Sequence, residues 1–290
     1  MARDSRRACS LQTLIGVDVL AQHLDDPSWR IVDCRFSLAD PNAGRSAYLA
    51  SHVPGAIHAD VDRHLSGPRV PGKTGRHPLP EKTQWIEQVR RFGISPATQV
   101  AAYDDSGGAF AARLWWMLRW NGHDRVAVLD GGWRAWTSRG LPVTAEVPTP
   151  ERAEGDWTGR PSLTRLVEAE HVDAARQLVL DARDRPRFRG ETEPIDPVAG
   201  HIPGARCSPA TANLDAQGYF KPPDELRRKF AAAGVAGDRD VVCYCGSGIT
   251  AAHNILALRV AGFDEALLYA GSWSEWITDP TRGVATGDCG

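Results

Sequence analysis

The feature that most constrains the fold of this 290-residue chain is an internal repeat, because its second half reproduces motifs of its first half in the same order. Residues 31–35 correspond to 179–183, 52–56 to 201–205, 100–104 to 241–245, and 131–136 to 271–276. The second pair reads His-Val-Pro-Gly-Ala and His-Ile-Pro-Gly-Ala. Matches in one order predict two copies of a single domain, in agreement with a length above the usual size of one domain.

Each half is expected to be an α/β domain, a largely parallel sheet flanked by helices, because short β-rich runs alternate with helical patterns. In the second half the patterns predict strands at 178–180, 240–244 and 266–269 and helices at 223–233 and 250–261. We expect an N-terminal domain at 1–140 and a C-terminal domain at 161–290. The segment 141–160 is expected to be an extended linker, because it contains Pro142, Pro148, Pro150, Gly155 and Gly159.

Composition argues against several classes of function. With 34 basic and 36 acidic residues, the net charge of -2 speaks against broad binding to nucleic acid. No window approaches the ~18 consecutive apolar residues of a membrane span, and the start lacks the apolar stretch of a secretory signal, so we expect a cytoplasmic protein without membrane contact. The six cysteines, Cys9 and Cys289 included, are scattered, which predicts reduced thiols, and they lack the spacing of a zinc site.

Cys245 is the strongest candidate for chemistry. It stands between the predicted strand 240–244 and the predicted helix 250–261, in the loop Cys-Gly-Ser-Gly-Ile-Thr. Gly246 and Gly248 let this loop curl and expose N–H groups, which together with the helix N-terminus favour a thiolate or persulfide anion. The alternative is a small apolar residue at a strand end, but such a cysteine belongs inside the strand, where Cys243 is expected.

The repeat supplies an internal comparison, because Asp104 occupies the position that corresponds to Cys245. A carboxylate cannot carry a persulfide sulfur. The first domain is therefore expected to be a catalytically inactive copy that walls one side of the active site.

Two other classes of protein remain as alternatives. A cysteine phosphatase or arsenate reductase also places a cysteine in an anion-binding loop, but a phosphatase needs an arginine six residues later, where this chain has Ala251. A non-catalytic binding module would leave the glycine-rich loop headed by a cysteine without a reason.

Taken together, the paired Asp-x-Arg and His-x-Pro-Gly-Ala motifs, the cysteine loop and Gly-Ser-Trp-x-Glu-Trp resemble the tandem rhodanese-domain sulfurtransferases. The loop is most similar to that of the 3-mercaptopyruvate sulfurtransferases, with thiosulfate sulfurtransferases as the alternative. The resemblance implies two rhodanese-like domains and transfer of sulfur from a small donor, through a cysteine persulfide, to cyanide, a small thiol or a thioredoxin-like protein. It implies no metal and no organic cofactor.

The resemblance also points to individual residues around Cys245. Arg187 matches the family's substrate-binding arginine, Arg189 is the neighbouring candidate, and a second arginine of some members has no counterpart in residues 193–196. Ser247, Asp62 and His77 are implied to form a trio that relays a proton, with Asp60 as the alternative carboxylate. The remaining implied substrate contacts are Gly246, Gly248, Ile249 and Thr250.

Residues present in both copies are better explained by folding than by catalysis, because one copy lacks the cysteine. On this ground His52 and His201 are predicted to be turn residues, and the Asp-x-Arg pairs to stabilise the fold. Paired tryptophans at i and i+3 are predicted to pack in the core: Trp133, Trp136, Trp273 and Trp276.

Overall fold

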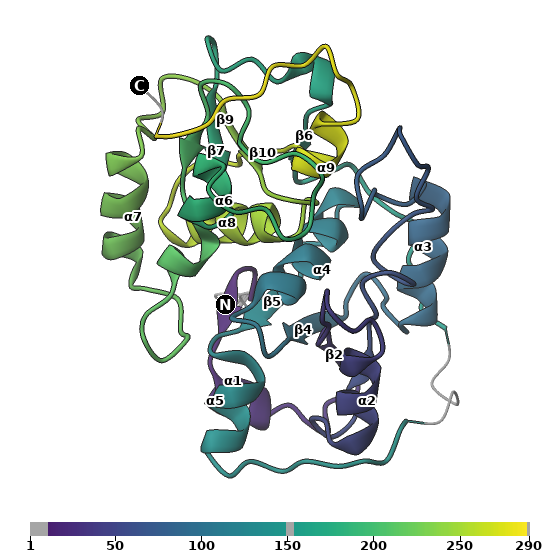
Figure 1. Cartoon of the computed structure of the whole chain (residues 1–290). Coiled ribbons are helices and arrows are strands. Elements are labelled where there is room, and N and C mark those ends of the chain that lie inside the picture. Colours follow the sequence, from purple (N-terminus) through teal and green to yellow (C-terminus); the bar gives the residue numbers. More distant parts are fainter. Residues whose placement is uncertain (1–10, 149–153, 289–290) are drawn as a thin grey trace, which may run out of the picture.

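The chain folds into two α/β domains, each built on a sheet of five parallel strands (Figure 1). The computed structural model describes residues 11–148 and 154–288. The first sheet has the order β1-β5-β4-β2-β3 and the second β6-β10-β9-β7-β8, so the strands occupy equivalent places in the two copies. The fold class predicted from the repeat is confirmed.

The strands of the first sheet are β1 (Leu14–Ile15), β2 (Trp29–Asp33), β3 (Ile57–His58), β4 (Gln99–Tyr103) and β5 (Val126–Leu129). Those of the second are β6 (Arg165–Leu166), β7 (Leu178–Asp181), β8 (Arg206–Cys207), β9 (Val241–Tyr244) and β10 (Leu267–Leu268). The helices of the first domain are α1 (Val17–Ala21), α2 (Ala43–Ala50), α3 (Lys82–Arg91), α4 (Ala109–Trp120) and α5 (Gly132–Ser138). The second domain has α6 (Arg185–Arg189), α7 (Pro223–Ala232), α8 (Thr250–Val260) and α9 (Ser272–Trp276), with 3₁₀ turns at Ala169–His171 and Ala210–Asn213.

The strands and helices predicted for the second half are confirmed, with ends that differ by at most one residue. The helix α6 was not predicted, because its basic sequence Arg-Pro-Arg-Phe-Arg has a single large apolar residue and shows no helical period. Asp184 precedes it, Pro186 stands in its first turn, and Gly190 follows it at φ +75°, a conformation that only glycine adopts readily. Phe188 is buried and holds this short helix against its sheet.

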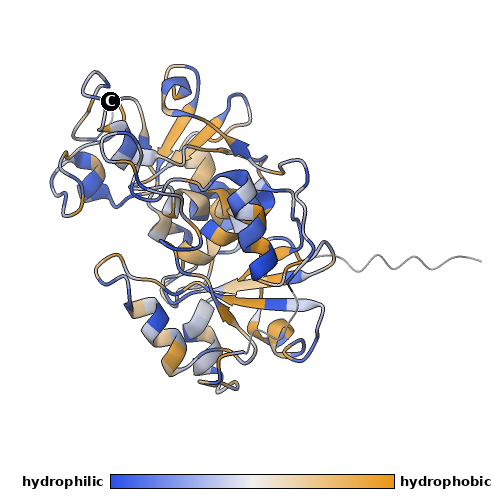
Figure 2. Ribbon diagram, turned by 90° about the vertical axis from the view of Figure 1, so that its right-hand side faces the viewer, coloured by the Kyte–Doolittle hydropathy of each residue, from blue (hydrophilic) through white to orange (hydrophobic). Residues whose placement is uncertain are grey.

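Alternation along the strands places side chains on both faces of each sheet, and both faces are covered. In the first domain α1 and α5 pack on one face and α3 and α4 on the other. In the second, α6 and α9 cover one face and α7 and α8 the other. Figure 2 shows the strands mainly in the hydrophobic colour, as expected for sheets buried on both faces.

The helices α4 and α8 meet at the domain junction, side by side in Figure 1. Residues 110–120 of α4 are all buried, because its own sheet covers one side and α8 the other. One apolar core therefore runs through both domains. Since α4 follows the loop after β4, and α8 the loop after β9, the two corresponding loops lie at this junction.

The segment expected to be a linker lies along the first domain over its described part. Thr144 pairs with His52 in a β-bridge, Gly155 donates to the carbonyl of Arg90 (2.8 Å), and Trp157 is 1% exposed. Pro150 of this segment lies outside the described residues, as do Cys9 and Cys289. The described cysteines, Cys34, Cys207, Cys243 and Cys245, are free thiols.

The residues predicted to serve the fold in both copies make equivalent contacts. His52 Nδ1 lies 2.7 Å from the carbonyl of Tyr48, and His201 Nδ1 2.7 Å from that of Phe188. Buried ion pairs of 2.6 Å join Arg35 to Asp33 and Arg183 to Asp181. Trp136, Trp273 and Trp276 are buried, whereas Trp133 is half-buried under the guanidinium of Arg35.

Among the described residues, no helix is both long and apolar enough to cross a bilayer.

Candidate active site

Cys245 lies directly after β9, at the carboxyl end of the second sheet, and is 2% exposed. The loop turns back so that the N–H groups of Ser247 and Gly248 point at Cys245 Sγ, at 3.5 and 3.1 Å. Gly248 has φ +77°, and a Cβ there would lie 2.3 Å from the carbonyl oxygen of Ala270. Only glycine therefore permits this turn, and the exposed N–H groups stabilise negative charge on the sulfur.

Cys243, the other thiol of this segment, points into the core from within β9. Burial raises its pKa to about 12. A thiol in this place is not ionised near neutral pH and has no route to a substrate.

The corresponding loop of the first domain holds a carboxylate in the same kind of cradle. Asp104 Oδ1 accepts from the N–H groups of Ser106 and Gly108, both at 2.8 Å, and Oδ2 from those of Phe110 and Ala111, at 2.8 and 2.9 Å. The loop is also covered by the second domain, since Leu214 lies against Gly107 and Phe220 against Gly108. An aspartate thus fills the place that would otherwise receive an anion.

A cavity of about 130 Å³ opens beside Cys245. From the second domain it is lined by Ala182, Arg183, Asp184, Arg187, Cys245, Gly246, Ser247, Ile249 and Thr250. From the first domain it is lined by Leu38, Arg76 and Phe110. Of the loop residues proposed as substrate contacts, Gly246, Ile249 and Thr250 line the cavity, whereas Gly248 contacts the sulfur of Cys245 from behind.

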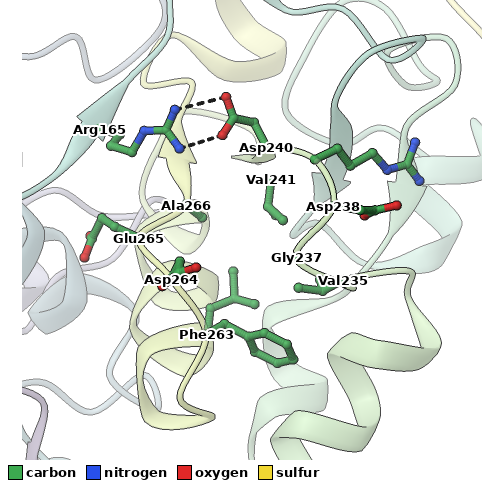
Figure 3. A pocket seen from close by; sticks show the side chains of 12 residues that line it. Arg165, Val235, Gly237, Asp238, Asp240, Val241, Phe263, Asp264, Glu265 and Ala266 are labelled. Carbon is green, nitrogen blue, oxygen red and sulfur yellow. Dashed lines mark hydrogen bonds and ion pairs between the residues drawn. The ribbon is translucent and has the colours of Figure 1, made fainter.

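A larger cavity of about 410 Å³ lies at the other end of the second sheet, beside the first residues of β9 and β10. Figure 3 shows the two-hydrogen-bond ion pair of Arg165 and Asp240 (2.6 and 3.0 Å) beside it, above a floor that includes Phe263 and Val235. Cys245 comes directly after the last residue of β9, at the opposite edge of the sheet, so this cavity is separate from the thiol.

Arg187 projects from α6 over the cysteine loop, within about 4 Å of the place where a Cβ on Gly246 would stand. Its Nε and Nη2 donate to Glu193 (3.1 and 2.8 Å), and Nη2 also reaches Asp196 (3.2 Å). Despite burial, the hydrogen bonds from Arg187 keep the pKa of Glu193 below its usual value. The guanidinium is thus held rigidly at the wall of the cavity.

Arg189, the neighbouring candidate for a substrate contact, does not line the cavity beside Cys245. It forms ion pairs with Glu191 (3.1 Å) and Asp288 (2.9 Å), and its side chain is 37% exposed. The reason is the unpredicted helix: residues two positions apart on a helix point about 200° apart, so Arg187 and Arg189 cannot both face Cys245.

Ser247, His77 and Asp62 are brought together across the domain junction. His77 Nδ1 lies 2.9 Å from Ser247 Oγ, and Nε2 lies 3.2 Å from Asp62 Oδ1. Burial, Arg113 and Arg76 lower the pKa of His77 to about 3, so the ring is neutral near pH 7. The neutral ring then donates from Nε2 to Asp62 and accepts the hydroxyl hydrogen of Ser247 at Nδ1. Asp60, the alternative carboxylate, accepts instead from the N–H groups of Asp62 and Arg63.

Two arginines of the first domain also belong to the site and were missed from the sequence. Arg76 lines the cavity, forms an ion pair with Asp196 and donates its backbone N–H to Ser274 (3.0 Å). Arg113 is buried in α4 and donates to the carbonyls of Gly248 and His77. The only signal for Arg76 was its position next to His77; Arg113 had none, since α4 reads as a core helix.

Comparisons with known proteins agree with this architecture. A family model described as a rhodanese-like domain matches residues 16–139 and 163–279. A probable 3-mercaptopyruvate sulfurtransferase of Pseudomonas aeruginosa is 49% identical over 284 residues, which is 95% of this chain and 98% of the relative. A putative thiosulfate sulfurtransferase of Mycobacterium tuberculosis is 40% identical over 262 residues, 89% of this chain and 90% of the relative.

Solved structures show the same likeness. The 3-mercaptopyruvate sulfurtransferase of Leishmania major has a TM-score of 0.81 at 33% identity and covers 91% of this chain and 74% of its own. The Escherichia coli 3-mercaptopyruvate enzyme has a TM-score of 0.77 at 31% identity and covers 91% of this chain and 100% of its own.

Proposed function

Because the chain belongs to the rhodanese family and is a sulfurtransferase, we propose that it takes sulfur from 3-mercaptopyruvate as a persulfide on Cys245 and passes it to a thiol or cyanide. The observation that supports this most is Cys245 Sγ in its N–H cradle, facing a small cavity with guanidinium groups on its walls. Likeness over nearly the whole chain to 3-mercaptopyruvate sulfurtransferases supports the choice of donor.

In the first step the Cys245 thiolate attacks the donor sulfur. A bond forms between the two sulfur atoms, the donor's carbon–sulfur bond breaks, and its electron pair leaves on the enolate of pyruvate. The proton of the donor thiol balances the proton that the enolate carbon takes up. Ser247, which lines the cavity and is bonded to His77, stands where it can relay that proton, with Asp62 orienting the ring.

In the second step an acceptor nucleophile attacks the outer sulfur of the persulfide, and Cys245 leaves as a thiolate. Cyanide would become thiocyanate, and a small thiol or a thioredoxin-like dithiol would become a persulfide. Both steps exchange sulfur between nucleophiles and need no metal or organic cofactor.

The donor carboxylate is proposed to bind Arg187 and Arg76, one from each domain. Both arginines line the cavity beside Cys245, and a guanidinium is a suitable hydrogen-bonding partner for a carboxylate. Gly246 and Ser247, next to the thiol, carry no charge. The first domain is proposed to be a non-catalytic copy that contributes Arg76 and His77 to the second.

Thiosulfate as the donor is the second candidate, because a relative at 40% identity is named a putative thiosulfate sulfurtransferase and because two guanidiniums could hold a dianion. A phosphatase-like reaction is not favoured, since the arginines of the cavity come from other segments and not from the cysteine loop.

The deciding experiment compares kcat/KM for mercaptopyruvate and thiosulfate at one fixed acceptor concentration. We expect mercaptopyruvate to be the better donor. A higher kcat/KM for thiosulfate would overturn the donor while leaving the persulfide chemistry intact. Peptide mapping after loading without acceptor should find one added sulfur at Cys245; an added sulfur at another cysteine would overturn the proposed carrier.

A further inference from the structure

Arg113 is a fully buried cation at the junction of the two domains, 0% exposed, in the middle of α4. Nη1 donates to the carbonyl of Gly248 (3.3 Å), and Nη2 to the carbonyls of His77 (3.0 Å) and Leu65 (3.3 Å). Gly248 and His77 both belong to the candidate active site. The N–H of Gly248 points at Cys245 Sγ, and His77 forms a hydrogen bond with Ser247. Arg113 is therefore linked to the sulfur of Cys245 through a single residue, Gly248, whose carbonyl accepts from Arg113 and whose N–H points at the sulfur.

The contacts of this arginine do not balance its charge. Among the described residues every hydrogen bond of Arg113 goes to a neutral carbonyl, its Nε is buried without a partner, and no carboxylate forms an ion pair with it. A buried charge is costly unless an opposite charge lies near. Burial lowers the pKa of Arg113 to about 10, and the charge of Cys245 acts in the opposite direction. The neighbour able to supply the missing negative charge is the sulfur.

We propose that Arg113 is the buried counter-charge of the Cys245 thiolate and persulfide, supplied by the first domain to the sulfur bound by the second. It touches neither donor nor acceptor, so it acts as a positioning and charge-balancing residue. It also connects the Ser247–His77 pair to the loop of Cys245, because its guanidinium donates hydrogen bonds to the carbonyls of both His77 and Gly248.

The other half of the repeat offers a comparison. There the contact runs the opposite way, from His253 of α8 to the carbonyl of Gly107 in the loop of Asp104, at 3.0 Å. Burial lowers the pKa of His253 to about 4, so this group is neutral. The carboxylate of Asp104 accepts four N–H groups and has a neutral neighbour, whereas the sulfur of Cys245 accepts two N–H groups. The permanent cation thus lies at the loop whose anion accepts fewer N–H groups.

The other cations near the thiol are already paired. Arg76 forms an ion pair with Asp196, Arg183 with Asp181, and Arg187 with Glu193 and Asp196. His77, on the remaining side, is neutral near pH 7. Arg113 thus differs from its neighbours in having a positive charge and no carboxylate partner in the described part of the chain.

The test is the pH dependence of alkylation of Cys245 by iodoacetamide, followed by mass spectrometry of its peptide, in Arg113→Gln and Arg113→Lys. Losing a nearby opposite charge moves a pKa by about 1–3 units. In Arg113→Gln the midpoint should therefore rise by about 1–3 pH units, with alkylation roughly 10- to 1,000-fold slower well below it. Arg113→Lys keeps the charge and should stay close to the unmodified protein.

Arg119→Gln is the matched control, because Arg119 lies on the same helix, is buried and reaches across the junction, but pairs with the carboxylate of Glu265 (3.0 Å). In Arg119→Gln the pH midpoint for alkylation of Cys245 should stay at the value of the unmodified protein. An unchanged midpoint in Arg113→Gln, or equal midpoints in the Gln and Lys variants, would overturn the proposal. If Arg113→Gln does not fold, a midpoint raised by a unit or more in folded Arg113→Lys would overturn it as well.

The proposal rests on the proposed function only in taking Cys245 as the sulfur carrier. The alkylation assay contains no sulfur donor, so an error about mercaptopyruvate would leave its result unchanged. Full sulfurtransferase activity in Cys245→Ser would remove the carrier itself and is measured separately.

Discussion

Replacing Arg187 with Ala should lower kcat/KM for mercaptopyruvate strongly, and the structure sets the size of the effect. Glu193 and Asp196 already engage Nε and Nη2, which leaves Nη1 without a hydrogen bond in the described part of the chain. One charge-assisted hydrogen bond to the donor carboxylate contributes about 1.5–3 kcal/mol. That corresponds to a loss of roughly 10- to 150-fold, expected mainly in KM.

The assay measures pyruvate release from mercaptopyruvate and thiocyanate formation from thiosulfate, each at saturating cyanide. Thiosulfate has no carboxylate, so its turnover should fall less. Arg189→Ala is the matched control, since Arg189 lies on the same helix but forms exposed ion pairs away from the cavity. An exposed pair contributes about 0–1 kcal/mol to stability, and this variant should keep nearly full activity with both donors.

A thermal melt of Arg187→Ala separates binding from folding, because Glu193 loses one of its cationic partners and keeps Arg183 at 3.4 Å. Equal losses with both donors would show that Arg187 anchors anions generally. Unchanged kcat/KM for mercaptopyruvate in a folded variant would refute the carboxylate contact.

Four further predictions follow from the site. Cys245→Ser should abolish sulfur transfer without unfolding the chain, because Cys243 is buried in its strand; residual persulfide formation would contradict this. Asp104→Cys should still load one labile sulfur per chain, as measured by cyanolysis, because the second domain covers that loop; two equivalents would show a competent second site. Asp196→Asn should raise the ratio of kcat/KM for thiosulfate to kcat/KM for mercaptopyruvate several-fold, because it removes the negative charge paired with Arg76 and Arg187 and so favours a dianion. A fall in this ratio would count against the prediction. The free energy of unfolding should decline as pH falls from about 6.5 toward 4, because burial lowers the folded-state pKa of His253 to about 4 while the unfolded chain binds the proton already near 6.5. His77 and His123, whose pKa values burial lowers to about 3 and about 4, act in the same direction, so His253→Gln should reduce this decline in urea titrations at several pH values without abolishing it.

The fold and the position of Cys245 were predictable because their signals are local. Short runs of consecutive apolar residues predict buried strands, and glycines after a strand predict a loop with exposed N–H groups, so Cys245 could be placed at the mouth of a sheet without any tertiary information. The repeat then identified Asp104 as its counterpart. The helix carrying Arg187 could not be recognised, because its single buried residue, Phe188, leaves no period to detect.

The sequence by itself therefore determined two α/β copies, a thiol in one loop and a carboxylate in the other. Only the tertiary structure decided which charges surround that thiol. Arg113 meets the loop of Cys245 from a position 135 residues earlier than Gly248, through packing of α4 on α8, whereas the contact of His77 with Ser247 was already implied by the family resemblance. The direction of α6 places Arg187, and not Arg189, at the wall of the cavity. Strand and loop propensities act over a few neighbouring residues, whereas the partners of a buried charge are set by how the two domains pack, and no local pattern records that arrangement.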